Sequence, residues 1–427
     1  MSDRANVLIA GGGVVGTALA WALAARGVRD VVVVDLDLAG VYASSELNAG
    51  GARATWWQPV NIATCRLTLD FFREHADEFG FREAGYLWLY DDDALFAQAR
   101  RHRDTQNREG LGVELLAPGD VLARFPIVDR HTDALVGATF SPRDGLVNPN
   151  AVRAFYRREA HGRGVHFLDR HYIAGVRTQR VTGAASAQRR IGSVEVVEVE
   201  AGHAFDAHDV VREILCTHHV PAARAASART IECDTVVNCL GALSPIFAAK
   251  IGVSDVTQPV RRQIALVDVH RSDWPDGVDL DAQGMIVDPS GLYFHPEGGH
   301  VLAGYSTPDE PPGYDFAYDG DDFFTAEIWP RLAHRCSAFE RCGHVRGWAG
   351  LYAVTPDCSG IAGAVAGFSN LFEAHSFTGR GVMQSYGVAA NMAARIATGS
   401  WDDVDLGVLA RDRFGDPTRH VREDLHI

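Results

Sequence analysis

The chain carries the run Gly11-Gly12-Gly13-Val14-Val15-Gly16 near its start, and Asp35 follows nineteen positions after Gly16. In a G-x-G-x-x-G turn, Gly11 makes the tight bend, Gly13 lets a pyrophosphate approach the backbone, and Gly16 lets a helix pack closely on a strand. The carboxylate of Asp35 would bind ribose hydroxyls and would repel a 2′-phosphate, which disfavours NADP. The spacing predicts a dinucleotide site, but it does not separate NAD from FAD.

The surrounding sequence predicts the elements that would hold these residues in place. Residues 7–10 are an apolar run typical of a buried parallel strand, and residues 31–34 are a β-branched run that ends at Asp35. Between them, residues 17–26 are rich in alanine and leucine and stop at Gly27, which predicts a helix with a glycine cap. The glycine turn would then lie at a helix N-terminus, where free N–H groups favour phosphate.

Further helices and strands are expected along the rest of the chain. Helices are predicted at 61–79, after residue 90 through 103, at 150–161 and at 382–397, and strands at 87–90, at 236–239 and within 259–310. From 182 to 230 the composition drifts toward Ala, Arg, Ser and Gln. This drift indicates edge strands and a mobile insertion at about 201–229.

Composition bounds the class of protein. The chain has 427 residues, of which 47% are hydrophobic, so it can bury two domains or one elaborated fold. A net charge of −15 would repel phosphate backbones and anionic membrane surfaces, so we expect no binding to nucleic acid. Residues 7–25 carry no charge, but the three central glycines and the lack of a cleavage site argue against a signal peptide or a membrane span.

The cysteines indicate a compartment and argue against a metal. Seven cysteines are scattered without a C-x-x-C pair, so we expect reduced thiols in a cytoplasmic protein. Cys336 and Cys342 lie between His334 and His344, and their six-residue spacing fits no common zinc knuckle or finger. We therefore expect no metal site.

Five separated segments together resemble one known family. They are ASSELNAGGAR (43–53), DGLVNP (144–149), VVNCLGA (236–242), WAGLYAVTPD (348–357) and FTGRGV (377–382). In this order, over nearly the whole chain, they look like the FAD-dependent amine and amino-acid oxidoreductases of the D-amino-acid oxidase superfamily, in the branch of sarcosine oxidase and dimethylglycine dehydrogenase.

The resemblance implies an α/β fold with two interleaved domains. A Rossmann-type FAD-binding domain would comprise residues 1–88, 148–252 and 347–427. A substrate domain of the α+β kind, built on a mixed sheet, would comprise residues 89–147 and 253–346.

The resemblance also implies FAD as the cofactor. The residues that would contact it are Gly11, Gly13, Val14, Val15, Gly16, Asp35, Leu36, Ser44, Ser45, Asn48, Gly50, Gly51, Ile173, Gly241, Gly379, Arg380, Gly381, Val382 and Met383. Residues 379–383 would face the flavin pyrimidine, where helix N–H groups and Arg380 would stabilise the negative charge of the reduced ring. In the sarcosine-oxidase branch a cysteine tethers the flavin at the position of Gly350, so we expect non-covalent FAD.

Candidates for substrate contact are Arg53, Trp56, Tyr293, His295 and His375. By the resemblance, Arg53 matches an arginine beside the flavin, whereas a second arginine and a lysine of that branch are replaced by Trp56 and Met383. The clamp for a small carboxylate would be incomplete, and the aromatic residues would give a more permissive pocket. Trp56 could equally be core filling, and an isolated histidine such as His375 is more often structural than functional.

Together these features predict an FAD-dependent enzyme that removes hydride from the carbon next to the nitrogen of an amino acid or N-methyl amine, after which the imine hydrolyses. A dehydrogenase is favoured over an oxidase, because a fixed cation near the flavin speeds oxygen reduction and the only lysine is Lys250. Two alternatives stay open. One is a flavin-dependent 2-hydroxy-acid dehydrogenase, which would need His375 or His295 as a base. The other is an FAD-binding assembly factor or subunit without turnover.

Overall fold

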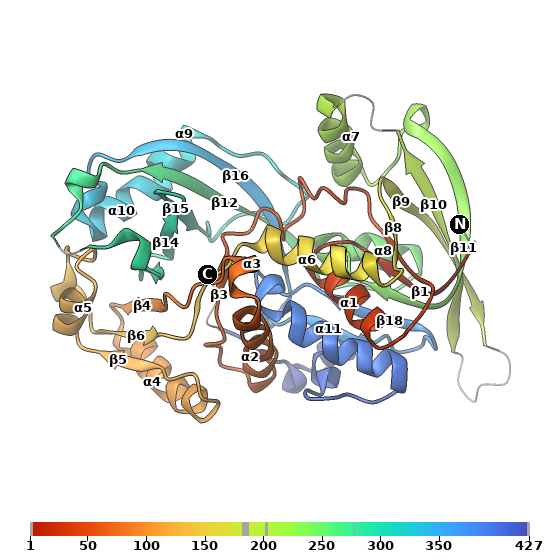
Figure 1. Ribbon diagram of the computed structural model, residues 1–427, viewed down its shortest axis with the longest axis horizontal. Coiled ribbons are helices and arrows are strands. Elements are labelled where there is room, and N and C mark those ends of the chain that lie inside the picture. Colours follow the sequence, from red (N-terminus) through yellow and green to blue (C-terminus); the bar gives the residue numbers. More distant parts are fainter. Residues whose placement is uncertain (1–2, 182–187, 201–203, 277, 425–427) are drawn as a thin grey trace.

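The computed structural model describes residues 3–181, 188–200, 204–276 and 278–424. Within them, two eight-stranded sheets lie toward opposite ends of the molecule, and long helices pack between and beside them (Figure 1). A short pair, β3 (Gly51–Ala52) and β7 (Gly145–Leu146), forms a third, two-stranded sheet. This architecture confirms the predicted α/β class.

The first sheet carries the glycine-rich turn. Its strands are β1 (Arg4–Ala10), β2 (Val31–Val34), β8 (His166–Leu168), β9 (His171–Arg180), β10 (Arg189–Val199), β11 (Ala225–Asn238), β17 (Ile361–Ala364) and β18 (Leu371–His375). Strands β18, β11, β1, β2 and β8 are parallel neighbours in that order, and β10 and β9 extend the sheet from β11 by antiparallel pairing. The apolar runs of β1 and β2 suit this central place, because parallel strands are covered on both faces.

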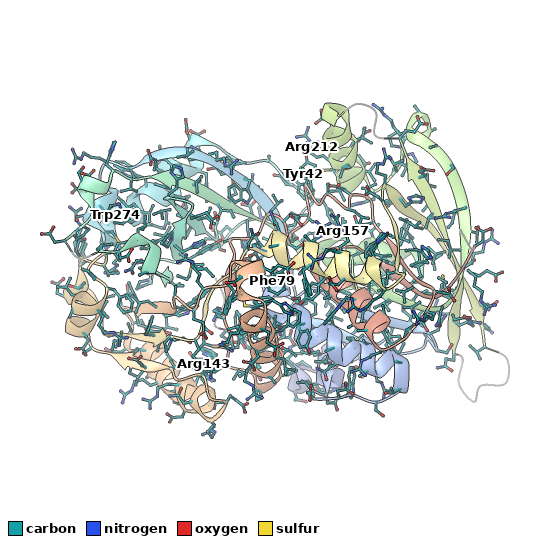
Figure 2. All side chains as sticks on the ribbon, viewed as in Figure 1. Tyr42, Phe79, Arg143, Arg157, Arg212 and Trp274 are labelled. Atoms are coloured by element: carbon teal, nitrogen blue, oxygen red, sulfur yellow. The ribbon has the colours of Figure 1, made fainter. Side chains whose placement is uncertain are left out.

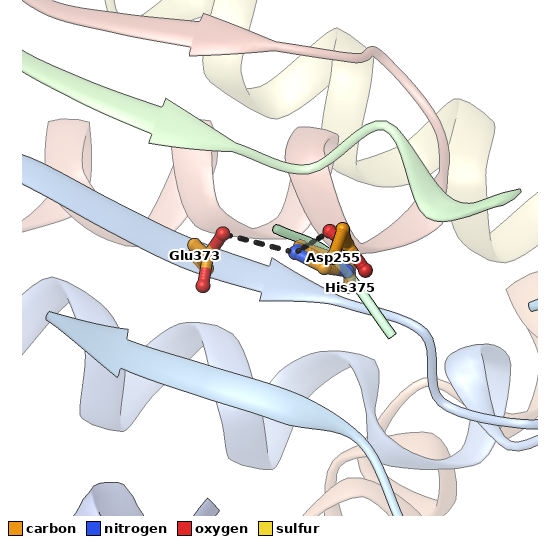
Figure 3. Close-up of side chains that lie close together, drawn as sticks. All are labelled: Asp255, Glu373 and His375. Carbon is orange, nitrogen blue, oxygen red and sulfur yellow. Dashed lines mark ion pairs between the residues drawn. The ribbon is translucent and has the colours of Figure 1, made fainter. Parts of the chain in front are cut away.

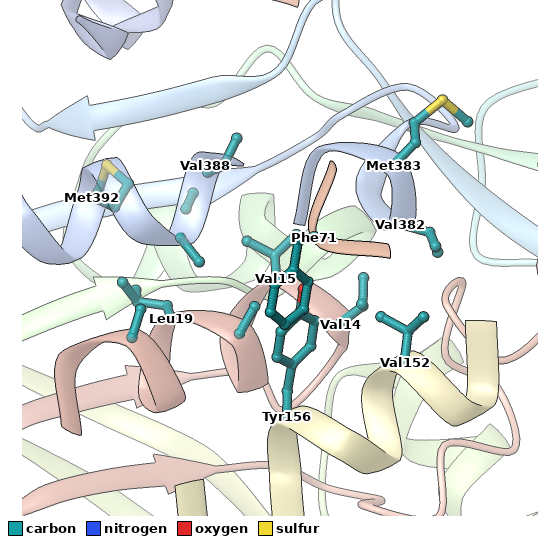
Figure 4. Packing of buried hydrophobic residues seen from close by; sticks show 14 of the residues in the cluster. Val14, Val15, Leu19, Phe71, Val152, Tyr156, Val382, Met383, Val388 and Met392 are labelled. Atoms are coloured by element: carbon teal, nitrogen blue, oxygen red, sulfur yellow. The ribbon is translucent and has the colours of Figure 1, made fainter. Parts of the chain in front are cut away.

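Four helices form the core beside this sheet: α1 (Val14–Ala25), α2 (Pro59–Glu74), α6 (Pro149–Gly162) and α11 (Gly381–Thr398). Figure 4 shows the apolar side chains that fill their interfaces, among them Leu19, Phe71 and Tyr156. Helices α2 and α11 approach closely at Gly387, where a Cβ atom would lie 2.2 Å from a backbone oxygen of α2. The predicted helices at 17–26, 150–161 and 382–397 are thus confirmed to within a few residues.

The second sheet is mixed and has the order β16-β12-β15-β14-β13-β4-β6-β5. Its strands are β4 (Tyr86–Tyr90), β5 (Glu114–Leu116), β6 (Gly137–Ser141), β12 (Gln258–Asp268), β13 (Met285–Val287), β14 (Leu292–Glu297), β15 (His300–Tyr305) and β16 (Gly343–Val354). One face packs under α5 (Pro118–Arg124), α9 (Asp321–Phe323) and α10 (Trp329–Arg335), with α4 (Asp93–Arg108) at the β4 end. The opposite face presents aromatic residues and packs on Ala49 and Leu146, so it meets the half of the molecule that holds the glycine turn.

Two expectations about elements need correction. Residues 61–79 form two helices, α2 and α3 (Ala76–Phe79), because the chain leaves helical geometry at His75. The segment 201–229 forms α7 (Ala204–Thr217) and the first part of β11, apart from 201–203, which lie outside the described residues. The short helix α8 (Ser244–Lys250) follows β11.

The chain passes between the two sheets more than once. The first sheet takes strands from residues 4–34, 166–238 and 361–375, and the second takes strands from 86–141 and 258–354. The domain boundaries given above remain a prediction, which this alternation supports. Among the described residues, no helix has the length and apolar character needed to cross a membrane.

Candidate functional site

A pocket opens beside the glycine turn, at the carboxyl ends of β1, β11 and β18, where open parallel sheets commonly bind ligands. Of the residues predicted from the sequence, it is lined by Gly11, Gly13, Val14, Val15, Asp35, Leu36, Ser44, Ser45, Asn48, Ile173, Gly241, His375, Gly379, Gly381 and Val382. Other predicted contacts lie outside this lining, namely Gly16, Gly50, Gly51, Arg380 and Met383. The fold therefore brings most of the predicted cofactor contacts, which are distant in sequence, into one pocket.

Close approaches of the backbone require glycine in the turn. Gly11 has φ of +101°, and a Cβ atom there would lie 2.6 Å from the carbonyl oxygen of Cys239. A Cβ atom at Gly16 would lie 1.9 Å from the carbonyl oxygen of Gly11, so α1 could not pack on the turn. Gly13 precedes α1, and no side chain caps the helix, so its first N–H groups remain available to a phosphate.

Asp35 is held beside this turn. Its Oδ2 accepts a hydrogen bond from the backbone N–H of Gly12 at 2.5 Å, and its Oδ1 accepts one from Asp37 at 2.7 Å. Burial raises the pKa of this carboxyl, and the two N–H groups oppose that shift. Arg153 on α6, which sequence analysis missed, stabilises the turn by donating hydrogen bonds to the carbonyl oxygens of Gly12 at 3.0 Å and Leu38 at 2.7 Å.

The second sheet holds the loop of residues 43–51 against the pocket. Ser44 Oγ donates to a backbone oxygen of β16 at 2.5 Å. In the other direction, Trp348 Nε1 and His295 Nε2 donate to carbonyl oxygens of the loop at 3.0 and 2.7 Å. Burial lowers the pKa of His295, and the carbonyl oxygens of Pro296 and Ala49, which lie 2.8 Å from Nδ1 and 2.7 Å from Nε2, oppose that shift. His295 thus joins the two halves of the molecule.

The loop between β18 and α11 is tightly constrained at the opposite side of the pocket. Ser376 and Thr378 have φ of +59° and +47°, values that are rare outside glycine and costly for a β-branched residue. A Cβ atom at Gly379 would lie 2.7 Å from the ring of Tyr352, so the tyrosine packs directly on this loop. Helix α11 then begins at Gly381 without a side-chain cap, and its first N–H groups are available to a ligand.

Two enclosed arginines flank Trp56. The Cζ atom of Arg53 lies 3.4 Å from the centroid of the Trp56 ring and 4.7 Å from that of Trp88, and the Cζ atom of Arg380 lies 4.7 Å from the Trp56 centroid. Burial lowers the pKa of both guanidinium groups, that of Arg53 to about 10. All three side-chain nitrogens of Arg380 are buried without a hydrogen-bond partner among the described residues. Buried donors of this kind normally have a partner, and the described residues do not supply one.

Three tyrosines of the second sheet, Tyr86, Tyr293 and Tyr352, form what we call the tyrosine wall. Their close packing again depends on glycine: a Cβ atom would lie 1.9 Å from the Tyr86 hydroxyl at Gly51 and 2.2 Å from the Tyr293 ring at Gly304. Burial raises the pKa of all three hydroxyls, so they are neutral. The sequence singled out Tyr293 but missed Tyr86 and Tyr352, although alternation along their strands could have placed them on the same face.

The imidazole of His375 is enclosed by protein groups (Figure 3). Its Nε2 lies 3.4 Å from Glu373 and 3.9 Å from Asp255, and its Nδ1 lies 2.7 Å from the hydroxyl of Ser376. Burial alone would raise the pKa of both carboxyls, but His375 and Arg411 lower it. The three side chains are close enough to hold a metal ion, yet Arg411 pairs with both carboxylates and occupies them. These ion pairs favour a structural role for the group, and a catalytic role of His375 stays a prediction.

The far end of the pocket is built mainly from residues that sequence analysis missed. Helix α7 contributes Val211, Ile214 and Leu215, and the second half of the molecule contributes Phe316. The ring centroids of Tyr42 and Phe316 are 5.1 Å apart, and Figure 2 shows Tyr42 close to Arg212 of α7. No local pattern marks these residues, because they meet only through the fold.

The pocket fits the expected dinucleotide. The turn of Gly11, Gly13 and Gly16, which we call the glycine cradle, and the uncapped start of α1 suit a pyrophosphate. The unpartnered donors of Arg380 lie beside the uncapped start of α11. Cys239 lines the pocket beside the turn, and burial raises the pKa of its thiol, which makes it a poor nucleophile. Non-covalent attachment stays a prediction.

Comparisons with known proteins identify the family of the chain. Residues 6–395 match the family model described as FAD dependent oxidoreductase (DAO). The chain is 28% identical to FAD-dependent oxidoreductase domain-containing protein 1 of Xenopus laevis, covering 96% of this chain and 83% of the relative. It is 27% identical to sarcosine oxidase subunit beta of Rhizobium meliloti (strain 1021), covering 46% and 50% of the two chains. Its fold matches L-proline dehydrogenase from P. horikoshii with a TM-score of 0.79 at 20% identity, over 97% of this chain and 99% of that one. The chain therefore belongs to the DAO family of FAD-dependent oxidoreductases.

Proposed function

We propose that the protein is an FAD-dependent dehydrogenase that oxidises the C–N bond of an amino acid or N-methyl amine. The tyrosine wall carries this proposal, because its member Tyr352 packs on Gly379 and lines the cofactor pocket, and the wall is neutral and partly apolar. Such a surface suits an amine bound without its extra proton. The names of two similar proteins, a sarcosine oxidase subunit and a proline dehydrogenase, denote substrates of this class.

In this mechanism, bound FAD supplies a two-electron acceptor that takes hydride. The chain holds it through the uncapped start of α1, the glycine cradle and Asp35. The start of α11, with Arg380 beside it, would stabilise negative charge on the reduced cofactor. The tyrosine wall orients the amine and limits the access of water. The lone pair on nitrogen assists the loss of hydride, and water then converts the iminium product to a carbonyl compound and a smaller amine.

The geometry supports this proposal over oxidation of a 2-hydroxy acid. That reaction needs a base to take the hydroxyl proton. His295 Nε2 donates to the loop of residues 43–51, and the ring of His375 is surrounded by Glu373, Asp255 and Ser376. Both ring nitrogens of His295 thus face carbonyl oxygens, and those of His375 face two carboxylates and a hydroxyl, which disfavours either ring as that base.

Anaerobic stopped-flow measurement of FAD absorbance tests the proposal. The holoenzyme is mixed with amino acids, N-methyl amino acids and matched 2-hydroxy acids of the same side chain. We expect loss of the oxidised-flavin band with at least one amine and no comparable loss with its hydroxy-acid counterpart. Reduction by hydroxy acids alone would establish the other dehydrogenase, and no reduction by any compound would establish a subunit without turnover.

A further inference from the structure

Glu423, in the segment that follows α11, is a fully buried acidic residue without a place in the proposed mechanism. Its oxygens accept hydrogen bonds from the backbone N–H groups of Trp57 at 3.0 Å and Gln58 at 3.2 Å, and from Nδ2 of Asn61 at 3.2 Å. Helix α2 has no side-chain cap from its own N-cap residue, so Glu423 supplies one from a distant segment. All three groups donate, and the start of a helix favours negative charge, so the site suits a carboxylate.

Two sets of contacts connect Glu423 to Arg380, which directly precedes α11. In the first, Nδ2 of Asn61 donates to Glu423, and Oδ1 of Asn61 accepts from Nε2 of Gln384 at 3.2 Å. The backbone N–H of Gln384 in turn donates to the carbonyl oxygen of Arg380 at 3.0 Å. In the second, the Trp56 ring lies 4.7 Å from Cζ of Arg380, and the next residue in the chain donates its backbone N–H to Glu423. The carboxylate is thus held in a fixed place relative to Arg380.

Among the charged groups around Arg380, Glu423 has the strongest opposite effect. Burial lowers the pKa of Arg380, and Glu423 opposes this shift most. Smaller opposing effects come from Cys65, Cys358 and Asp357. Burial raises the pKa of both thiols, so they are neutral, and Asp357 is held in its own ion pair. Glu423 is therefore the main counter-charge of this enclosed arginine.

Glu423 balances Arg380 without pairing with it. All three side-chain nitrogens of Arg380 lack a hydrogen-bond partner among the described residues, whereas the oxygens of Glu423 are engaged by α2 and the residues just before it. The carboxylate thus offsets the charge of the guanidinium and leaves its donors available at the edge of the cofactor pocket.

We propose that Glu423 tunes the reduction potential of bound FAD, because its carboxylate offsets part of the positive charge that Arg380 brings to the start of α11. Uptake of two electrons and one proton leaves the flavin with one negative charge, which a nearby cation stabilises and a nearby anion destabilises. The segment after α11 thus keeps the potential lower than Arg380 alone would set it. The inference concerns the cofactor and goes beyond the proposed amine oxidation.

The midpoint potential of bound FAD tests this inference in the absence of an amine substrate. The FAD-loaded protein is reduced anaerobically by xanthine and xanthine oxidase beside a reference dye. Glu423→Gln removes the charge but keeps an oxygen that can accept from the same N–H groups. We expect its potential to exceed that of the wild-type protein by about 30 mV or more, which is a tenfold change in the equilibrium constant of a two-electron reduction. Glu423→Asp keeps the charge and should shift the potential less.

Further variants test the balance between the two charges. Arg380→Met removes the cation and should lower the potential, and the double variant Glu423→Gln with Arg380→Met should fall between the two single variants. Asp424→Asn is the matched control, because it removes the same charge from the adjacent, exposed residue and should leave the potential unchanged.

The outcomes separate this inference from the proposed function, since no amine enters the measurement. An unchanged or lower potential in Glu423→Gln, or an equal rise in Asp424→Asn, would overturn it. If Glu423→Gln does not retain FAD, the double variant is compared with Arg380→Met: a higher potential in the double variant supports the inference, and an equal one overturns it. Loss of FAD from both variants that carry Glu423→Gln would give Glu423 a role in folding alone and would also overturn it.

Discussion

Arg53 shows how a single side chain supports the substrate side of the pocket. Its planar guanidinium stacks 3.4 Å from the centroid of Trp56, and its Nη1 donates to the carbonyl oxygen of Thr55 at 2.9 Å. A lysine would keep the charge but could neither stack in this way nor hold the same hydrogen-bond geometry. We predict that Arg53→Lys slows the reduction of FAD about tenfold, because a misplacement of about 1 Å can cost that much or more.

The measurement is the rate of flavin reduction in the anaerobic stopped-flow, with FAD content determined on the same sample. FAD should remain bound, since Arg53 does not line the cofactor pocket. The exposed Arg346→Lys serves as control. Unchanged reductive kinetics in Arg53→Lys would give Arg53 a purely structural role.

Individual residues differ in how far the sequence could identify them. Gly11 and Gly16 were predictable because the G-x-G-x-x-G spacing marks positions where a side chain would clash with the backbone. The structure shows the close contacts that exclude a Cβ atom at both positions. Met383, predicted to face the flavin, belongs to the buried apolar cluster and does not line the pocket, and its contact with the flavin stays a prediction. Tyr86 belongs to no motif, and its place in the tyrosine wall depends on strands that pair across the second sheet.

Among the elements, helix α7 closes the far end of the cofactor pocket. Val211, Ile214 and Leu215 line it, and Ile214 is fully buried. Shortening buried apolar side chains removes contacts worth about 2–5 kcal/mol for each isoleucine or leucine truncated to alanine. We predict that the double variant Ile214→Ala and Leu215→Ala weakens FAD binding about tenfold or more, because some of the lost contacts would be contacts with the bound cofactor.

Titration of the apoprotein with FAD, followed by quenching of flavin fluorescence, gives the dissociation constant. Val345→Ala is the matched control, because Val345 is 47% exposed on β16. An unchanged dissociation constant in the double variant would show that α7 covers the pocket without binding the cofactor.

The segment that follows α11 is anchored by a buried ion pair. Arg413 donates to both oxygens of Asp357 at 2.7 and 2.9 Å, and both side chains are fully enclosed. The same segment places Glu423 where it accepts hydrogen bonds from the backbone of Trp57 and Gln58, at the start of α2. The pair therefore fixes the loop that carries Trp56.

Replacing Arg413 leaves Asp357 as an uncompensated buried charge. We predict that Arg413→Met lowers the free energy of unfolding by about 3–5 kcal/mol at neutral pH, measured by urea denaturation. Arg419→Met, which removes an exposed pair with Asp412, should have little effect.

The effect should depend on pH in a defined direction. Burial would raise the pKa of Asp357, but Arg413 holds it below the ordinary value. The stability that this carboxylate contributes is therefore complete above the pKa of an unfolded aspartate, about 4, and is lost as the pH falls through the lower folded value. The difference between wild type and Arg413→Met should shrink below pH 4, and a difference that grows there would contradict the assignment.

The whole molecule is an arrangement of two sheets that meet around one pocket. The sequence was sufficient for the central strands of the first sheet, β1, β2 and the end of β11, because these runs and the glycine turn are local patterns, but it did not predict β8, β9, β17 and β18. It was insufficient for the substrate side, where strands from residues 86–90, 258–268, 292–297 and 343–354 must pair before their side chains share a face. The far end of the pocket was missed for the same reason, since α7 and the loop at Phe316 come from distant segments.

This arrangement also bears on the electron acceptor. Lys250 Nζ donates to the backbone oxygen of Ala174 at 3.3 Å and lies 5.4 Å from the centroid of the Tyr172 ring. Among the described residues, no lysine contacts Tyr352. The nearby Arg53 and Arg380 are buried, and the charge of a guanidinium group is spread over three nitrogens rather than concentrated on one. We predict that reduced enzyme reacts with air-saturated buffer at least about tenfold more slowly than with a quinone or dye acceptor. Reoxidation by oxygen as fast as turnover would identify an oxidase.

The central claim is that the amine carbon gives its hydride to FAD and is released as a carbonyl compound. An anaerobic single turnover tests it most directly: the holoenzyme, in excess over an N-methyl amino acid that bleaches the flavin, is reacted to completion, quenched and analysed for products. The account predicts one aldehyde or keto acid and one shortened amine for each FAD reduced, with no product when FAD stays oxidised. Flavin reduction without carbonyl release, or reduction by 2-hydroxy acids alone, would contradict it.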